Sequence, residues 1–507
     1  MVIIGYVKKG IFMAIDNLIP LIIISLFLVG IIIVGKIASR SVESSDDYMV
    51  AGRGAPLLLI VGTLFATFWG GGTIIGATGA AYTDGMFGIV EDPFAAGLAL
   101  IVLGLFFVST LRKLKIRSIG ELYKRRFGKL TSYLASALMI PTYLIWTAVQ
   151  LLAIGKILNG LFEVPFIVGF LIATVVVIAF TFMGGLVAVV WTDAIQMIII
   201  FIGLIAILVV GFKAADGVTN VMNHAPENFW NILPRHNSVM SWISYIAMWA
   251  GMALGNIPSP DLAQRAFMAK DEKTAKQGML IAGGLYWTLG FIPIIIALIG
   301  ITLVSNGTLD ASVINGDSEL LITVMAKSLF GPVGLGIFVA SLVAAILSSA
   351  STSLFATAVL FSNDIYKPLM EVKHHSEVEI DKKMLKVTRN FVILVGVLSA
   401  LVGLSSDRIY DLTIFAFTLQ FGVLFFPFIF ALKSKRVNTY GIIAGMCGGL
   451  AVNLFGVISE QSVIPEPWEF YTLVPALVNL ILIVIVSNFT KNKNQSVPLE
   501  ALYINDI

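Results

Sequence analysis

Apolar segments long enough to cross a membrane recur along the whole chain, separated by short polar stretches. A helix needs about 20 apolar residues to cross the hydrocarbon core of a bilayer. The segments that meet this length are 18–38, 56–82, 87–111, 131–158, 164–184, 187–213, 239–258, 277–303, 330–361, 385–405, 409–432, 436–458 and 467–489. The pattern predicts an all-α integral membrane protein with 13 transmembrane helices. The first is too long for a cleaved signal peptide and lacks the small-residue cleavage site.

The composition agrees with a membrane protein and argues against several function classes. Of the 507 residues, 58% are hydrophobic and 12% are charged, whereas soluble domains carry roughly 25% charged residues. The single cysteine excludes an internal disulfide, and the four histidines do not stand at metal-ligand spacing. We find no P-loop, so an ATP-driven pump is not expected. We expect no enzyme activity, and neither nucleic acid nor nucleotide as a partner.

Basic residues are distributed unevenly between the loops. Most of the 33 Lys and Arg residues lie in alternate polar segments, namely 36–53, 112–129, 265–276, 367–389, 433–436 and 491–493. The positive-inside rule makes these segments cytoplasmic, which places the N-terminus outside the plasma membrane and the C-terminus inside. The spans hold basic residues only near their ends, such as Lys156 near an outer end. We therefore expect no fixed cation in the membrane that could bind a substrate carboxylate.

The second span contains the stretch "ATFWGGGTIIGATG", residues 66–79, with three consecutive glycines at its centre. Each glycine weakens a helix by roughly 1 kcal/mol relative to alanine. One interpretation is a broken helix whose free carbonyl groups face a binding site. The other is close helix packing through small residues, which Gly72 and Gly76 would serve. The glycines alone do not decide between the two.

Two further polar features lie in predicted spans. The segment 344–358, "AAILSSASTSLFATA", places Ser348, Ser351 and Thr352 on one helix face. Hydroxyl oxygens suit an alkali cation, but hydrogen bonds between helices would use the same residues. The carboxylate of Asp193 costs about 2.5–3.5 kcal/mol near the middle of a bilayer. It is therefore either an ion-binding residue or a residue at the cytoplasmic interface.

Acidic residues also stand next to prolines. Glu91 and Asp92 precede Pro93, where they would stabilise a helix N-terminus or line an outward vestibule for a cation. Asp261 follows Pro258 and Pro260, which break the seventh span. We interpret Asp261 as the cap of a cytoplasmic helix.

Six segments occur together in an order that resembles the sodium:solute symporter family. They are "DDYMVAGRG", "FATFWGGGTIIGATGAAY", "SIGELYKRRFG", "FTFMGGLVAVVWTDAIQ", "AAILSSASTSLFATAVLFSNDIY" and "NTYGIIAGMCGGL". The resemblance covers residues 40–490 and implies the leucine-transporter fold, with two inverted five-helix repeats. It divides the single domain 1–507 into a peripheral helix 18–38, repeats 56–213 and 239–432, peripheral helices 436–489 and a cytoplasmic tail 490–507.

The resemblance also implies sodium sites. Its main site maps to the carbonyl groups of Ala66, Trp69 and Ala345 and the hydroxyls of Ser348 and Ser349. A possible second sodium would use Asp193, Ser351 and Thr352. Sodium at the main site would tie the broken second span to the ninth, so that ion and solute bind cooperatively and cross by alternating access.

The expected solute is a small organic molecule imported with sodium across the lipid bilayer. The residues expected to touch it are Phe68, Gly70, Thr73, Glu91, Asp92, Trp146 and Ser259. Acidic and aromatic residues favour a cationic or zwitterionic amine, such as choline or proline. Of the three positions that match the aromatic cage of choline transporters, Phe68 and Trp146 are aromatic and Ser259 is not. A sugar or vitamin carrier, a proton-coupled carrier, a sensory membrane module and an uncoupled channel remain alternatives.

Overall fold

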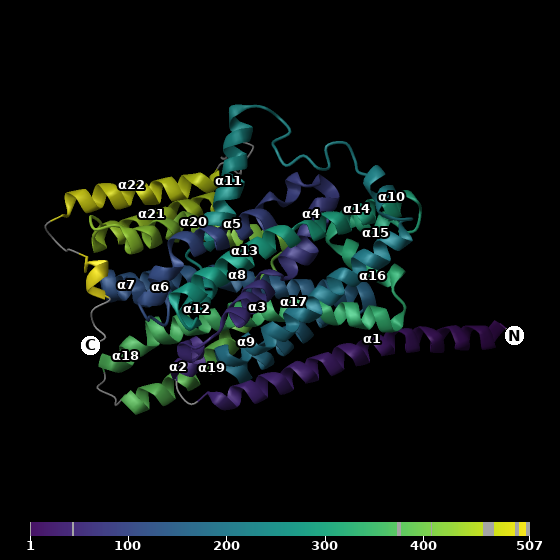
Figure 1. The fold of residues 1–507 in the computed structure, drawn as a ribbon, viewed down its shortest axis with the longest axis horizontal. Coiled ribbons are helices and arrows are strands. Elements are labelled where there is room, and N and C mark those ends of the chain that lie inside the picture. Colours follow the sequence, from purple (N-terminus) through teal and green to yellow (C-terminus); the bar gives the residue numbers. More distant parts are fainter. Residues whose placement is uncertain are drawn as a thin grey trace.

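The computed structural model describes residues 2–42, 45–372, 377–406, 408–459, 471–491 and 496–502. Within these ranges the chain is helical, and its one β feature is an isolated bridge between Ala55 and Ala269. His374, His375, the first residues of the last predicted span (467–470) and two parts of the tail (492–495, 503–507) lie outside the described residues. Most long helices run side by side along the long axis of the molecule (Figure 1).

The helices of the N-terminal half follow the predicted spans and their connections. They are α1 (Val2–Ala38), α2 (Ser45–Val50), α3 (Leu57–Phe68), α4 (Ala77–Asp84), α5 (Ala96–Phe106), α6 (Val108–Lys113), α7 (Ile119–Phe127), α8 (Lys129–Phe162), α9 (Phe166–Ala214) and α10 (Val218–Asn223). Two π-helical turns, Gly72–Gly76 and Val90–Ala95, lead into α4 and α5. Short 3-10 turns cover Ser39–Ser41, Ala51–Arg53 and Phe87–Ile89.

The C-terminal half has the same character. Its helices are α11 (Val239–Asn256), α12 (Pro260–Met268), α13 (Glu272–Leu289), α14 (Phe291–Ser305), α15 (Ala311–Gly316), α16 (Leu321–Leu329), α17 (Pro332–Val359), α18 (Lys367–Val372), α19 (Glu377–Gly403), α20 (Ile409–Lys433), α21 (Thr439–Ile458) and α22 (Leu473–Phe489). A π-helical turn, Leu360–Tyr366, extends α17 into α18, and 3-10 turns cover Ser318–Leu320 and Leu499–Leu502.

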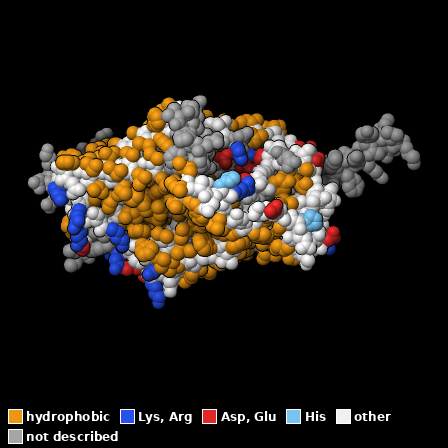
Figure 2. Space-filling model, turned by 90° about the horizontal axis from the view of Figure 1, so that it is seen from above, with side chains coloured by type: hydrophobic (Ala, Val, Ile, Leu, Met, Phe, Trp, Pro, Cys, Tyr) orange, Lys and Arg blue, Asp and Glu red, His pale blue; other side chains and the backbone are white. Residues whose placement is uncertain are grey.

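The surface has the character of a membrane protein. Figure 2 shows a wide band of hydrophobic side chains between two more polar ends, with Lys and Arg gathered at one end of the visible face. Exposed Leu26, Val175 and Ile205 illustrate the large apolar side chains that face outward. Among the described residues, nine helices are long and apolar enough to cross a membrane, or ten if the bent pair of α3 and α4 is one span.

Three of the long helical segments are interrupted rather than straight. The axis bends by 55° between Leu57–Phe68 and Gly72–Asp84, which confirms the predicted break in the second span. The long run of α9 breaks at Gly185, whose φ of 59° favours glycine and whose Cβ would meet the Tyr48 ring at 2.4 Å. This break separates the predicted spans 164–184 and 187–213. A third interruption lies between α11 and α12.

The centre of the molecule is helix α17. It packs against α1, α3, α8 and α9, and its residues from Phe338 to Val359 are buried. The ends of α3 and α12 also reach this helix. Because α17 has no lipid-facing side along these residues, its hydroxyl groups must find partners within the protein. The interrupted helices supply those partners.

Candidate functional site

The glycine run opens the helix and also packs closely. The amide of Gly70 donates to the carbonyl of Phe68 at 2.9 Å, so the regular helical pattern ends after α3. A Cβ added at Gly70 would lie 2.6 Å from Ser349 Oγ, and one at Gly71 would lie 2.4 Å from Ala153 Cβ. One at Gly72 would lie 2.8 Å from Thr413 Oγ1. Both interpretations of the glycines, a broken helix and close packing, therefore apply. The three glycines at the break each lie in close contact with a different helix.

Helix α17 meets the broken end of α3 through Ser349. Its hydroxyl donates to the carbonyl of Thr67 at 2.6 Å and lies 3.3 Å from the carbonyl of Ala345. Ala66 and Trp69 flank Thr67 and are buried at the same helix end. Carbonyl groups at a helix C-terminus carry partial negative charge, which favours a cation. The structure thus brings four of the five residues of the expected main sodium site to one place.

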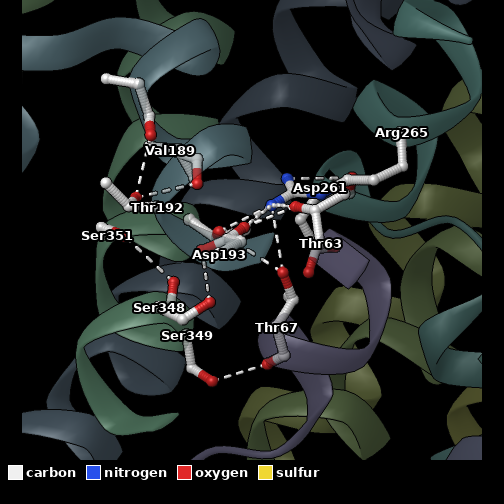
Figure 3. Close-up of polar contacts among 12 residues, drawn as sticks. Thr63, Thr67, Val189, Thr192, Asp193, Asp261, Arg265, Ser348, Ser349 and Ser351 are labelled. Atoms are coloured by element: carbon white, nitrogen blue, oxygen red, sulfur yellow. Dashed lines mark hydrogen bonds and ion pairs between the residues drawn. The ribbon is translucent and has the colours of Figure 1, made fainter. Parts of the chain in front are cut away.

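The fifth residue, Ser348, turns toward Asp193. Its hydroxyl donates to Asp193 Oδ1 at 2.5 Å, and Thr63 donates to Asp193 Oδ2 at 2.5 Å. Asp193 is fully buried within the protein. Figure 3 shows this carboxylate between α3, α9 and α17. A carboxylate in this position needs both hydrogen bonds and a counter-charge.

That counter-charge is Arg265, which the distribution of basic residues assigned to a cytoplasmic segment. The side chain is fully buried, and its Nη2 lies 3.4 Å from Asp193 Oδ2. The expectation that the membrane interior holds no fixed cation is therefore wrong. The physical reason is that α12 does not leave the membrane after the proline break but packs against α3 and α17, carrying Arg265 inward (Figure 3).

The guanidinium also engages the hydroxyl groups around it. Nη2 lies 2.7 Å from Thr352 Oγ1, 3.0 Å from Thr67 Oγ1 and 3.1 Å from Thr63 Oγ1. Ser351, by contrast, donates to the carbonyl of Ser348 in its own helix. Of the expected second-sodium residues, Asp193 and Thr352 are thus brought together around Arg265, and Ser351 contacts neither in the hydrogen bonds of the described residues.

A small cavity lies beside this cluster. It is lined by Thr67, Phe68, Asp92, Ala96, Trp146, Met252, Asn256, Asp261, Tyr286 and Phe417. The space open to the centre of a water molecule is about 10 Å³, which suits about one water. No residue of this lining is Lys or Arg. The lining combines two buried carboxylates with four aromatic rings.

Each of the two carboxylates is held by tyrosine. Tyr286 donates to Asp92 Oδ1 at 2.6 Å, and Thr73 donates to Asp92 Oδ2 at 2.9 Å. Tyr143 donates to Asp261, which also accepts the amide of Leu262 at 2.8 Å. Both carboxylates are at most 4% exposed. Both carboxylates therefore face the protein interior. Asp92 lies in the first turn of the π-helical segment that leads into α5, and the N-cap residue of α12 is Ser259 rather than Asp261.

The remaining expected solute residues lie outside the lining. Thr73 donates a hydrogen bond to Asp92, and Gly70 packs closely against Ser349. Glu91 is partly buried, and Ser259 is buried and accepts a hydrogen bond from Gln420. Phe68, Asp92 and Trp146 are the expected residues that the cavity brings together.

The lining also contains residues that the sequence reading did not single out as solute contacts. They are Thr67, Ala96, Met252, Asn256, Asp261, Tyr286 and Phe417. Only Asp261 carried a signal, as an acidic residue next to two prolines. A tyrosine or phenylalanine within an apolar span gives no such signal, since most serve packing.

Comparison with known proteins decides the family. A model of the sodium:solute symporter family matches residues 48–449. The chain belongs to the sodium:solute symporter family. It is a transporter rather than an enzyme, sodium is the ion that it transports with its solute, and the apolar helices make it a multi-pass membrane protein.

Similar members of this family carry different solutes. The high-affinity choline transporter 1 of Caenorhabditis elegans is 26% identical over 466 residues, which cover 87% of this chain and 78% of that protein. The osmoregulated proline transporter OpuE of Bacillus subtilis is 27% identical over 492 residues, which cover 93% and 95%. The sodium/pantothenate symporter of Haemophilus influenzae is 25% identical over 485 residues, which cover 93% and 96%.

The symporter fold is also seen in a solved structure. A Na⁺-coupled sialic acid symporter in its substrate-bound outward-open state superposes with a TM-score of 0.78 over 94% of this chain and 99% of that one. At 19% sequence identity the likeness shows the fold alone. The chain thus has the leucine-transporter fold that the resemblance to the family implied, and the fold supports symport by alternating access.

Proposed function

We propose that this symporter imports a small amine, cationic or zwitterionic, together with sodium. The observation that carries the proposal is the cavity whose lining includes Asp92 and Asp261 but no basic side chain. Phe68, Trp146 and Tyr286 border the same space. An ammonium group binds to aromatic faces by cation–π attraction and to carboxylates by charge, so this lining suits an amine better than an anion.

The lining also bears on the choice between a cation and a zwitterion. The indole Nε1 of Trp146 is buried and has no hydrogen-bond partner in the described part of the chain. This N–H can donate a hydrogen bond to a solute carboxylate or hydroxyl oxygen, which a proline-like amino acid or choline would supply. Similar proteins include both choline and proline transporters. A sugar or vitamin remains the second candidate, favoured by the sodium/pantothenate relative.

The proposed sodium position is the broken end of α3. The Ser349 hydroxyl already contacts the carbonyl group of Thr67 in α3 and that of Ala345 in its own helix, and Ala66, Trp69 and Ser348 are neighbours of these residues. A sodium ion here would neutralise the partial negative charge at the buried helix end and hold α3 against α17. The small cavity would have to enlarge to admit an organic solute, and the 55° bend of the second span is a natural place for that motion.

The proposed topology has 13 spans. The shorter apolar helices Phe166–Phe182 and Leu473–Phe489, together with α11, extend the ten candidates to this number. The repeats would cover 56–213 and 239–432 of the single domain 1–507, with 18–38 and 436–489 peripheral. The N-terminus would lie outside and the tail 490–507 in the cytoplasm, which the Lys- and Arg-rich end in Figure 2 supports.

Cysteine labelling tests this orientation. Cys447 is the only cysteine, so a Cys447→Ser background accepts single cysteines at Lys115 and Asn306. A membrane-impermeant maleimide added to intact cells should label the cysteine at position 306 and leave the one at position 115 unlabelled until the cells are lysed. The opposite pattern would contradict the proposed orientation.

A binding screen tests the solute class. Purified protein is melted with choline, proline, glucose or pantothenate in sodium and in potassium. A solute that binds the folded state raises the melting temperature by mass action, and we expect choline or proline to do so more strongly in sodium. Asp92→Asn should abolish the shift, whereas the matched variant Asp411→Asn, at an exposed ion pair with Arg408, should keep it. A shift with glucose or pantothenate alone would overturn the proposal.

A further inference from the structure

Arg265 stands where a cation bound by Asp193 would have to lie. Its Nη2 is within 3.4 Å of four oxygen atoms, contributed by Asp193, Thr63, Thr67 and Thr352. These are hard oxygen ligands of the kind that sodium takes in proteins. Nη2 carries two hydrogens, so it cannot donate a separate hydrogen bond to each of these four oxygen atoms. The positive charge of the guanidinium, rather than one directed hydrogen bond, therefore accounts for the arrangement of the oxygens.

Arg265 already neutralises the charge of Asp193, so a second cation at this cluster would have no carboxylate charge to offset its own. Arg265 and Asp193 are both fully buried, so the charges between them are shielded from bulk solvent. A sodium ion on the same oxygens would lie within a few ångströms of the guanidinium and be repelled in a low-dielectric interior. Arginine stays charged under all conditions that proteins meet. The guanidinium therefore cannot give way by losing its proton.

The contacts of Ser348 and Ser351 agree with this. Ser348 donates its hydroxyl proton to Asp193, and Ser351 donates to a backbone carbonyl. In contrast, Ser349 faces the carbonyl groups of Thr67 and Ala345, away from the guanidinium's contacts. The oxygen-rich region beneath the break thus divides into one part held by Arg265 and one part without a basic partner.

We propose that Arg265 is a built-in cation that takes the place of a second sodium ion, so that this symporter couples a single sodium to each solute. The inference rests on the proposed function, because it specifies the ion requirement of that transport. Ionised Asp92, Asp193 and Asp261 with Arg265 leave two negative charges around the cavity. One sodium and one singly charged ammonium group neutralise them, and this balance makes the binding of each depend on the other.

Equilibrium binding of ²²Na⁺ to the purified protein tests the inference without any solute, so its outcome does not depend on the amine proposal. The wild type should bind one ion per chain, and Arg265→Lys, which keeps the charge, should also bind one. Arg265→Ala removes the cation and leaves Asp193 with its hydroxyl groups, so it should bind two. Arg126→Ala is the matched control, because it removes a buried arginine that contacts Ser434 and Val497 instead. It should bind one.

Two results would overturn the inference. One is a wild type that binds two ions, with one lost in Asp193→Asn and the other weakened in Ser349→Ala. The other is a folded Arg265→Ala protein, judged by a single symmetric gel-filtration peak, that still binds one ion. Should Arg265→Ala not fold, the wild type and Ser349→Ala decide. One ion in the wild type, bound about tenfold more weakly in Ser349→Ala, supports the inference. Two ions in the wild type, of which Ser349→Ala weakens only one, contradict it.

Discussion

The two interrupted spans around the cavity are built by different means. The second span breaks at Gly70, Gly71 and Gly72, and the broken end presents backbone groups to α17. The seventh span breaks at Pro258, between α11 and α12, and the helix that follows carries Asp261 and Arg265 into the interior. Glycine allows a close approach of backbone, whereas proline ends one helix and starts the next with its side chains intact. One break therefore offers dipoles and the other offers charges.

This difference suits the two regions to different kinds of ligand. Carbonyl groups at the end of α3 can bind a cation that comes and goes, because no charge there is fixed. The charges on α12 belong to the chain itself, and Arg265 pairs with Asp193. The proposed sodium site and the ion pair are neighbours through Thr67, whose carbonyl serves one and whose hydroxyl serves the other.

The largest expected effect on stability comes from removing one charge of the Asp193–Arg265 ion pair. Asp193→Asn leaves the buried guanidinium without its counter-charge, which should lower the free energy of unfolding by about 3–5 kcal/mol. The double variant Asp193→Asn/Arg265→Gln removes both charges and should recover most of the lost stability. Thermal melts in detergent measure both. Equal melting temperatures for the wild type and Asp193→Asn would show that the pair is not a buried ion pair.

Overpacking the glycine side should have the next largest effect. Gly71→Ala places a Cβ 2.4 Å from Ala153 Cβ, and such overpacking costs about 1–3 kcal/mol. Gly284 in α13 has no atom within 4 Å of its added Cβ, so Gly284→Ala should stabilise the protein by about 1 kcal/mol. The comparison uses melting temperatures. If both substitutions shift stability in the same direction, the close-packed break is wrong.

A smaller effect is expected for the hydroxyl of Ser349, which joins α17 to the end of α3. Ser349→Ala should raise the sodium concentration for half-maximal uptake about tenfold, which corresponds to about 1.4 kcal/mol of ion binding. Ser351→Ala should change it by less than about threefold, because its hydroxyl bonds within its own helix. Sodium titrations of solute uptake into proteoliposomes measure both. An unchanged sodium dependence in Ser349→Ala would remove the proposed sodium site from α17.

The smallest effect is expected for the proline break itself. Pro258→Ala should destabilise by about 0.4–1 kcal/mol, mainly because the unfolded chain gains freedom. The side chains of Asp261 and Arg265 should keep their partners, since Pro260 still begins α12. Solute affinity from the melting screen should therefore stay within about twofold of the wild type. A large loss would mean that Pro258 positions the charges directly.

The same two regions differ in how far the sequence alone predicts their structure. Three glycines in an apolar run weaken the helix locally, but they did not by themselves decide between a break and close packing. The resemblance to the family favoured the break. The place of Arg265 was not predictable, because Lys270, Lys273 and Lys276 follow it and make the whole segment resemble a cytoplasmic loop. Its burial depends on where α12 packs, which is a property of the tertiary structure. Tyr286 escaped notice for the same reason, since its contact with Asp92 joins helices far apart in sequence.

The most direct test of the account is solute accumulation in proteoliposomes that contain only this protein. With radiolabelled choline and proline as probes, an inward sodium gradient should drive at least one of them to an internal concentration above the external one. An equal potassium gradient should not. Ser349→Ala at low sodium should lose the accumulation, whereas Ser351→Ala should keep it. Uptake that stops when the two concentrations are equal, under either gradient, would show an uncoupled pathway and contradict the account.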